Sequence, residues 1–220
     1  QSAWTDAAKE QQPKFSLSLG FVIANEHTPI AFMEGLAMNL LKSAKKKAKM
    51  LKKQKGYSGG TIDFLVLKSL SMISSDLGSF REALQTEESV ARRQSNPNEK
   101  RHALTMRPFT LHEMGGFIDT VKAFKKSNFP RSQLYQLRQS LHRGKASSTL
   151  DYLYFFSKLR TQEAHDAKRT LESHWHGFEG SIAPWYKAAD GGYETLLLDL
   201  MESYDFIDNP KESEGSDDNA

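Results

Sequence analysis

The sequence contains no cysteine. This absence excludes disulfide bonds, thiolate catalysis and any zinc or iron–sulfur site built on cysteine, and it is typical of proteins in a reducing cytoplasm. Long apolar stretches are also missing, because no run approaches the roughly 20 residues of a membrane-spanning helix. Residues 1–14 are polar, unlike a secretory signal peptide. We therefore expect a cytoplasmic protein that does not contact a membrane.

Several motifs of known catalytic sites are absent as well. Neither HExxH nor the glycine-rich phosphate loops GxxxxGK[ST] and GxGxxG occur. Among seven histidines, His174 and His176 lie two residues apart and His165 precedes them. No acid stands at a metal-binding spacing from them, so the sequence predicts no metal site.

The overall composition is ordinary, but the charge is unevenly distributed. The chain has 220 residues, 38% hydrophobic and 26% charged, with a net charge of +3, which suits one or two globular domains. Between residues 42 and 55 there are eight lysines and no acid. Residues 208–220 hold five acids and one lysine, and this composition predicts a disordered tail.

The first half of the chain has an alternation of strands and helices. Apolar runs predict strands at residues 15–24 and 61–68. Between them lies a helix of about six turns, which Thr28 and Pro29 begin and Gly56 ends. Strand, helix and strand with short connections form a crossover unit, so both strands belong to one sheet. Residues 69–75 and 101–109 are further candidate strands, and the polar residues 85–100 predict a loop.

From residue 110 the pattern becomes helical. Thr110 and Glu113 have the spacing of a capping box, which begins a helix that runs to residue 126. Further helices are predicted at 132–143, 148–160, 163–175 and 193–204. In the helix at 132–143, Leu134, Leu137 and Leu141 share one face. The sequence therefore predicts an α+β fold.

The lysine-rich segment has two interpretations on charge alone. It can be a solvated helix face, or it can bind polyphosphate or nucleic acid, since lysines grouped on one face supply salt-dependent affinity for phosphate. Charge density by itself does not decide between them.

Neighbouring motifs resemble a known family. Residues 18–24 (SLGFVIA), Pro29 and the spacing Ala37-x-x-Leu40-x-x-x-Ala44-Lys45 resemble the second half of the palm domain shared by GGDEF-type nucleotide cyclases and the large subunit of type III CRISPR effector complexes. The CRISPR branch is more similar, because its elements follow in order at residues 25–30 (NEHTPI), 62–67 (IDFLVL), 107–110 (RPFT), 130–137 (PRSQLYQL) and 196–200 (LLLDL).

The resemblance implies a fold and a domain organisation. Residues 1–109 are expected to be the C-terminal part of a ferredoxin-like palm (strand–helix–strand), residues 110–207 an all-helical domain, and residues 208–220 the tail. The family's Gly-Gly-Asp-Asp hairpin, which holds the Mg or Mn ions of nucleotidyl transfer, does not occur in the chain. Residues 2–12 resemble the helix that follows this hairpin. We therefore expect the C-terminal piece of a longer subunit, not catalytic alone.

The resemblance also implies a function in antiviral defence. The family converts ATP to cyclic oligoadenylates when its complex binds target RNA. In this chain we expect Ser18, Gly20, His27, Lys45 and Lys49 to border the nucleotide. We expect Arg131, Arg138 and Arg143 to contact guide or target RNA or other subunits of the complex.

Two other functions remain open at this point. The chain can be a non-catalytic scaffold or RNA-binding module of the same kind of complex, with a palm remnant that is only structural. It can also be a fragment of a GGDEF-type signalling cyclase, although the long helical extension argues against this. A Gly-Gly-Asp-Asp motif upstream of residue 1 would favour the enzyme.

Overall fold

The computed structural model describes residues 16–67, 76–173, 184–188 and 190–207. The fold is a mixture of helices and two small sheets, as the α+β prediction requires. The chain forms two compact units: Gln1–Leu77 with Arg107–Met114, and Gly78–Met106 with Gly115–Ala220. Over the described ranges, no helix combines the length and the apolar character that crossing a membrane requires.

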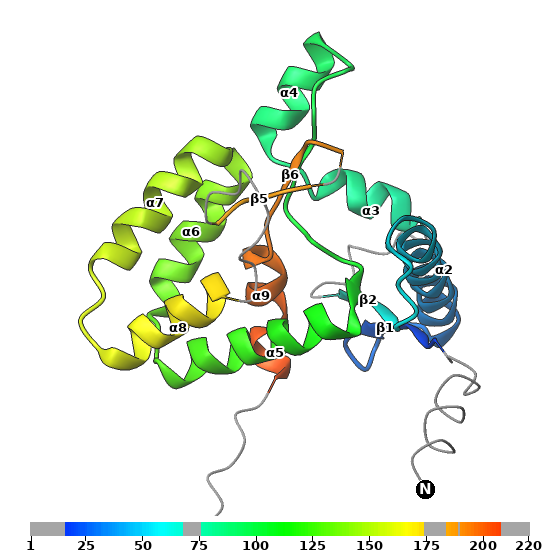
Figure 1. Cartoon of the computed structure of the whole chain (residues 1–220), viewed down its shortest axis with the longest axis horizontal. Coiled ribbons are helices and arrows are strands. Elements are labelled where there is room, and N and C mark those ends of the chain that lie inside the picture. Colours follow the sequence, from blue (N-terminus) through cyan, green and yellow to red (C-terminus); the bar gives the residue numbers. More distant parts are fainter. Residues whose placement is uncertain (1–15, 68–75, 174–183, 189, 208–220) are drawn as a thin grey trace, which may run out of the picture. The chain divides into compact units, whose positions relative to one another are not determined.

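The first unit contains the predicted crossover. Strands β1 (Ser18–Ile23) and β2 (Thr61–Val66) run parallel, with Ser18 opposite Thr61 and Ile23 opposite Val66. Helix α2 (Ile30–Lys55) connects them, and β4 (Phe109–Thr110) pairs antiparallel with the other edge of β2 (Figure 1). The prediction of one sheet with a helical connection is confirmed.

Helix α2 lies against the sheet through an apolar stripe. Leu36, Leu40 and Ala44 are fully buried, because residues four apart in sequence share one helix face. Gly56 ends the helix as predicted, in the left-handed conformation with φ of 65°, which glycine adopts without steric cost. The predicted start was wrong by one residue: Pro29 occupies the N-cap position, so Thr28 does not cap the helix.

Gly20 sets the distance between β1 and α2. A Cβ atom at Gly20 would lie 2.3 Å from the backbone nitrogen of Leu41 and 2.7 Å from the carbonyl oxygen of Ala37. Both atoms belong to the helix backbone, which cannot move aside as a flexible side chain can. The strand therefore needs glycine here for close packing against the helix.

The residues Arg107–Thr110 complete this unit. Arg107 is buried, donates a hydrogen bond from Nη1 to the Phe64 carbonyl oxygen (3.0 Å) and lies over the Phe64 ring. Thr110 and Glu113 form the predicted capping box at the start of α5 (Leu111–Lys126): the Glu113 amide donates to Thr110 Oγ1 (3.1 Å), and the Thr110 amide donates to Glu113 Oε2 (2.6 Å). The motif at residues 107–110, which is part of the resemblance, thus stabilises the first unit.

The second unit is mainly helical. Its helices are α3 (Leu77–Ala83), α4 (Glu87–Ser95), the remainder of α5, α6 (Arg131–Arg143), α7 (Lys145–Ser157), α8 (Gln162–Ser173) and α9 (Leu197–Ser203), followed by the 3-10 turn η2 (Tyr204–Phe206). Leu134, Leu137 and Leu141 are buried on one face of α6, as predicted. The buried Asp199 of α9 accepts a hydrogen bond from the Met106 amide (2.9 Å).

The expectation of an all-helical second domain was wrong. Short strands β3 (His102–Ala103), β6 (Tyr193–Glu194) and β5 (Tyr186–Lys187) form a second sheet in that order. The single strand predicted at 101–109 is therefore divided: β3 belongs to this sheet and β4 to the first. Pro108 precedes β4, and proline has no N–H with which to continue a strand ladder.

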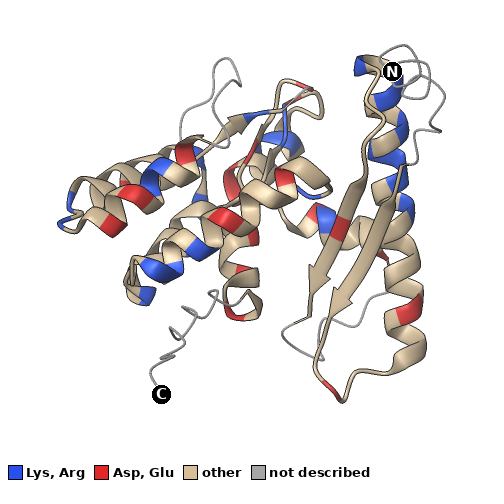
Figure 2. Ribbon diagram, turned by 60° about the horizontal axis from the view of Figure 1, so that its bottom comes forward, with Lys and Arg blue, Asp and Glu red and all other residues tan. Residues whose placement is uncertain are grey.

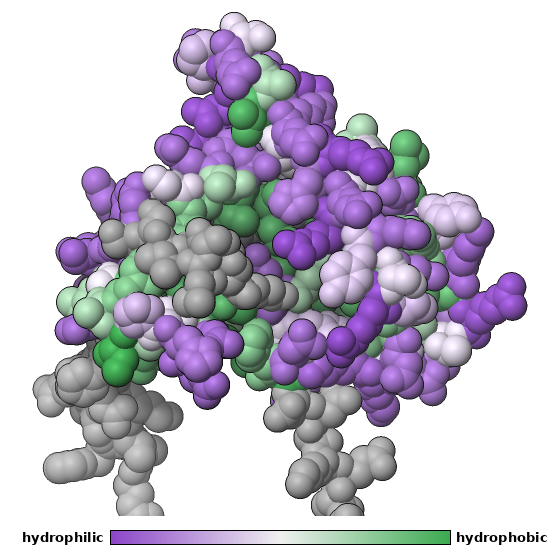
Figure 3. Space-filling view, turned by 180° about the vertical axis from the view of Figure 1, so that it is seen from behind, coloured by the Kyte–Doolittle hydropathy of each residue, from purple (hydrophilic) through white to green (hydrophobic). Residues whose placement is uncertain are grey.

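Helix α4 is a second correction, because residues 85–100 were expected to form a loop. Thr86 Oγ1 accepts a hydrogen bond from the Ser89 amide (3.0 Å), which is an N-cap. Glu87 and Glu88 lie in the first turn and Arg92 and Arg93 in the last, where each sign of charge complements the helix dipole. Figure 3 shows mostly hydrophilic side chains around α4, which explains why apolar periodicity did not reveal it.

The candidate strand at 69–75 and the acidic tail lie outside the described residues.

Candidate functional site

Six exposed lysines form a row along helix α2. They are Lys42, Lys45, Lys46, Lys49, Lys52 and Lys53, and together they are called the lysine ridge. Figure 2 shows these basic residues gathered on the second half of the helix. Their spacings of three, four and seven residues place them on one face, and a rise of 1.5 Å per residue makes the ridge about 16 Å long.

The ridge lysines form no ion pairs with other residues in the part of the chain that the structure describes. Like charges three or four residues apart destabilise a helix by about 0.2–0.5 kcal/mol per pair. Lys52 and Lys53 lie in the last turn, where cations complement the helix dipole. That effect is confined to the last turn, so it does not explain Lys42, Lys45, Lys46 and Lys49.

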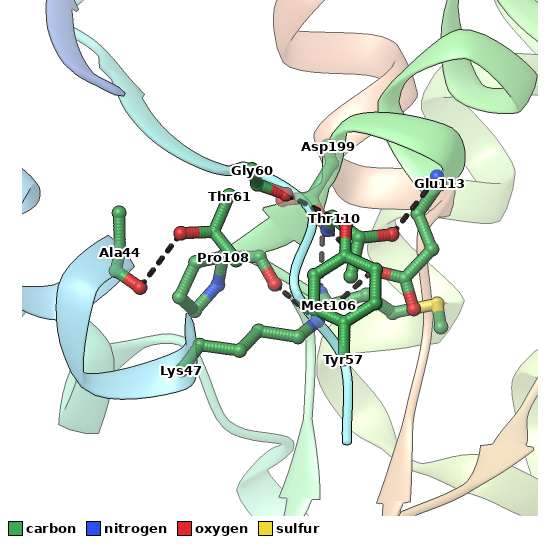
Figure 4. A network of polar contacts seen from close by, with 10 residues as sticks. All are labelled: Ala44, Lys47, Tyr57, Gly60, Thr61, Met106, Pro108, Thr110, Glu113 and Asp199. Atoms are coloured by element: carbon green, nitrogen blue, oxygen red, sulfur yellow. Dashed lines mark hydrogen bonds and ion pairs between the residues drawn. The ribbon is translucent and has the colours of Figure 1, made fainter. Parts of the chain in front are cut away.

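Lys47 belongs to the lysine-rich segment but not to the ridge. Its ammonium group lies 3.0 Å from Glu113 Oε2 and also donates a hydrogen bond to the Pro108 carbonyl oxygen (Figure 4). Only 20% of the Lys47 side chain is exposed. Sequence reasoning missed this residue, although a signal was present: Lys47 follows Ala44 by three residues and so continues the buried stripe.

A chain of hydrogen bonds joins the start of β1 to the middle of α2. Ser18 Oγ lies 3.1 Å from Thr61 Oγ1, and Thr61 Oγ1 donates to the Ala44 carbonyl oxygen (2.8 Å). Figure 4 shows the bond between Thr61 and Ala44. Lys45 follows Ala44 directly. Of the residues expected to border a nucleotide, Ser18 therefore lies near the backbone of α2 at the residue before Lys45. The side chains of Lys45 and of Lys49, one helical turn further on, are exposed on the outward face.

Gly20 and His27 have different surroundings. Gly20 faces the backbone of α2, so the space beside its Cα atom is filled by the helix and not open to a ligand. His27 lies beyond the other end of β1, its side chain 76% exposed and its Nε2 3.6 Å from Glu26 Oε1. Because a strand rises about 3.3 Å per residue, the six residues of β1 separate His27 from Ser18 by roughly 20 Å. The structure does not bring His27 to the ridge.

The three arginines of the second unit differ in their contacts. Arg131 Nη2 lies 3.3 Å from Asp205 Oδ1, and its guanidinium lies 5.8 Å from the centre of the Tyr204 ring. Arg138 is half-buried, and Arg143 is exposed at the end of α6. Arg131 thus already has an intramolecular carboxylate partner, whereas Arg143 projects into solvent.

A polar and aromatic cluster lies on the second sheet. The His102 ring contacts Tyr193 edge-on at 5.5 Å and lies 6.1 Å from Trp185. The Lys145 ammonium lies 3.2 Å from the centre of the Tyr193 ring, and Trp185 Nε1 donates to Ser148 Oγ (2.8 Å). Burial lowers the pKa of His102, which keeps the imidazole neutral near pH 7. These contacts hold the sheet against the start of α7.

No metal-binding group is evident. Across the described ranges, no three histidine or carboxylate side chains are placed so that they could hold a metal ion. His165 is exposed on α8, and His174 and His176 lie outside the described residues. The ridge therefore remains the strongest candidate site, and its chemistry is the binding of negatively charged groups.

No family model and no curated protein matches the chain.

Proposed function

We propose that this chain is the C-terminal part of the large subunit of a type III CRISPR effector complex. The parent protein is then an ATP-using nucleotidyl cyclase that makes cyclic oligoadenylates, and it acts in the cytoplasm. Support comes from the parallel β1–α2–β2 unit, because the resemblance implies strand, helix and strand at the end of the palm. The motifs at residues 18–23, 37–45 and 62–66, which are part of the resemblance, occur in these elements.

One observation carries the proposal of a nucleotide site. The hydrogen bonds from Ser18 through Thr61 to Ala44 hold the start of β1 against the backbone of α2 at the residue before Lys45, and Lys45 and Lys49 form no ion pair with other described residues. Two unneutralised ammonium groups one turn apart suit the phosphates of ATP. The chain binds and orients the nucleotide, and the Gly-Gly-Asp-Asp hairpin of the parent subunit supplies the Mg or Mn ligands.

The test compares two pairs of ridge lysines in the full-length subunit. Lys45→Ala with Lys49→Ala should raise the dissociation constant of ATP about tenfold or more, since each charged hydrogen bond contributes about 1.5–3 kcal/mol. Lys52→Ala with Lys53→Ala removes the same charge from the same face and serves as the matched control. Equal weakening by both pairs, or no weakening by the first, would reject a specific nucleotide site. The coding sequence before residue 1 must also encode the Gly-Gly-Asp-Asp motif.

An exposed apolar row on α7 favours a second candidate function, that of a scaffold. Tyr152, Phe155 and Phe156 are buried, whereas Leu150, Leu153 and Tyr154 are 68%, 55% and 53% exposed. The four aromatic side chains of α7 therefore do not all point inward, because successive residues of a helix turn by about 100°. The row suits docking of another subunit of the complex, with Arg138 and Arg143 available for RNA or for acidic groups.

This second candidate has its own experiment. Leu150→Ser with Leu153→Ser in the full chain should abolish co-purification with the small helical subunit of the complex, while circular dichroism remains unchanged. Ala146→Ser on the same helix is the control. Retained co-purification would contradict the scaffold role without affecting the nucleotide site.

A further inference from the structure

The lysine ridge is longer than a single nucleotide needs. Lys42 and Lys53 are eleven residues apart on α2, which corresponds to about 16 Å along the helix axis. Four of its six lysines lie outside the pair assigned to ATP, and none of the four forms an ion pair with other described residues. A ligand that engages the whole ridge must carry many negative charges along its length.

The shape of the ridge excludes a compact anion as its full occupant. An α-helix is convex, so a row of lysines on its outward face cannot enclose a small molecule. The opposite face of α2 is buried through Leu36, Leu40 and Ala44. A row of cations along the outward face of a helix instead matches an extended chain of phosphates that lies along it.

The same packing distinguishes between possible polyanions. A helix that enters the major groove of a duplex fills most of the groove, because the helix with its side chains is about 10–12 Å wide and the groove about 12 Å. The side of α2 that carries Leu36, Leu40 and Ala44 is buried, so the helix can present its ridge face but cannot be surrounded by a groove. A membrane-surface helix needs an apolar face for the lipid, and the apolar face of α2 is already buried.

We propose that the lysine ridge binds the phosphate backbone of a single-stranded nucleic acid, laid along the outward face of α2. Contacts from lysine ammonium groups to phosphates carry no base specificity. The interaction is therefore independent of sequence and strongly dependent on salt. It extends beyond the proposed nucleotide site, because it uses Lys42, Lys46, Lys52 and Lys53 in addition to Lys45 and Lys49.

The experiment measures the salt dependence of binding of the full chain to a short uridine RNA oligomer. Neutralisation of six phosphates on a single strand gives a slope of log K against log salt of about −4, and two remaining lysines give about −1.5. The ridge variant carries Lys42→Gln, Lys46→Gln, Lys52→Gln and Lys53→Gln; glutamine keeps helix propensity. The matched control removes the same charge elsewhere, with Lys100→Gln, Lys126→Gln, Lys158→Gln and Arg160→Gln.

We expect the slope of log K against log salt to become less steep by about 3 in the ridge variant. In the control it should remain near the wild-type value. Undetectable binding at about 50 mM salt, an unchanged slope in the ridge variant, or an equal fall in the control would overturn the proposal. Tighter binding to a duplex of the same length, or to vesicles of anionic lipid, would also overturn it. Because this variant keeps Lys45 and Lys49, the ATP measurement reports separately on the nucleotide site.

Discussion

The ammonium group of Lys47 lies 3.0 Å from Oε2 of Glu113, a residue 66 positions further along the chain. The same carboxylate oxygen accepts the Thr110 amide hydrogen bond, 2.6 Å long, that begins α5. One lysine of a segment that otherwise faces solvent therefore connects α2 to the capping box. Lys47 stabilises the fold, whereas the neighbouring Lys45, Lys46 and Lys49 are exposed.

This division of roles predicts opposite consequences for adjacent lysines. Lys47→Met should lower the free energy of unfolding by about 1.5–3 kcal/mol, because a charge-assisted hydrogen bond is lost and the Pro108 and Glu113 acceptors lose their donor. Lys46→Met, on the exposed face, should change it by less than about 0.5 kcal/mol. Urea denaturation of the two variants checks this. Equal effects would mean that the contact with Glu113 contributes nothing to stability.

Two glycines of the first unit, Gly20 and Gly35, are predicted to affect stability in opposite directions when each is replaced by alanine. Gly20→Ala places a methyl group against the backbone of Leu41 and Ala37, and we expect destabilisation by about 1–3 kcal/mol from overpacking. Gly35 lies on α2 with open space around it. Gly35→Ala should therefore stabilise the chain by about 0.5–1 kcal/mol through helix propensity. Thermal unfolding of both variants distinguishes them, and a neutral Gly20→Ala would contradict the close packing.

Elements with a strong periodic pattern could be predicted from the sequence. The crossover unit followed from two apolar runs and a helical stripe that ends at Gly56, and the capping box of Thr110 and Glu113 was recognised from its spacing. These features depend on residues close together in the chain. Local spacing also placed Leu134, Leu137 and Leu141 on the buried face of α6.

Features that depend on distant partners could not be predicted. Strand β3 has two residues and is defined by its pairing with β6, about 90 residues further along the chain, whereas the two-residue strands β5 and β6 pair with each other six to eight residues apart. The role of Lys47 depends on Glu113, and no local pattern indicates that partner. Helix α4 was missed for another reason: its stability comes from the Thr86 cap and its terminal charges, and it lacks an apolar stripe. For the candidate site, the sequence indicated the cluster of lysines but not which of them are exposed.

His102 predicts how stability changes with pH. Burial lowers its pKa below the ordinary 6.5, with opposing effects from Glu88 and Glu99, which raise it, and from Lys145 and Arg92, which lower it further. A histidine with a depressed folded-state pKa contributes stability above the unfolded pKa. That contribution is lost as the pH falls from about 6.5 toward the folded-state value. Burial lowers the pKa of His142 as well, so both residues act in the same direction.

The variant His102→Phe isolates this contribution. Phenylalanine keeps an aromatic ring beside Trp185 and Tyr193, and His102 Nδ1 makes no hydrogen bond that the replacement would break within the described structure. We expect the difference in Tm between pH 7.5 and pH 5 to be smaller in the variant than in the wild type. An identical pH dependence would show that the pKa of His102 does not differ between the folded and unfolded states or that other groups dominate.

Finally, the lysine ridge predicts a trade between stability and binding. Lys46 lies four residues after Lys42 and three before Lys49, so Lys46→Glu converts two repulsive pairs into attractive ones. At low salt we expect the free energy of unfolding to rise by about 0.5–1.5 kcal/mol, and Lys46→Gln, which only removes the repulsion, should give about half of that. The gain should nearly vanish at about 1 M salt, where the Debye length is about 3 Å, whereas a gain from helix propensity or packing would persist.

If the ridge binds a nucleic-acid strand, the stabilised variant should also bind RNA more weakly than Lys46→Gln does, because glutamate repels phosphate. A Lys46→Glu variant that is both more stable and equally tight in binding would show that the repulsion among these lysines serves no phosphate ligand.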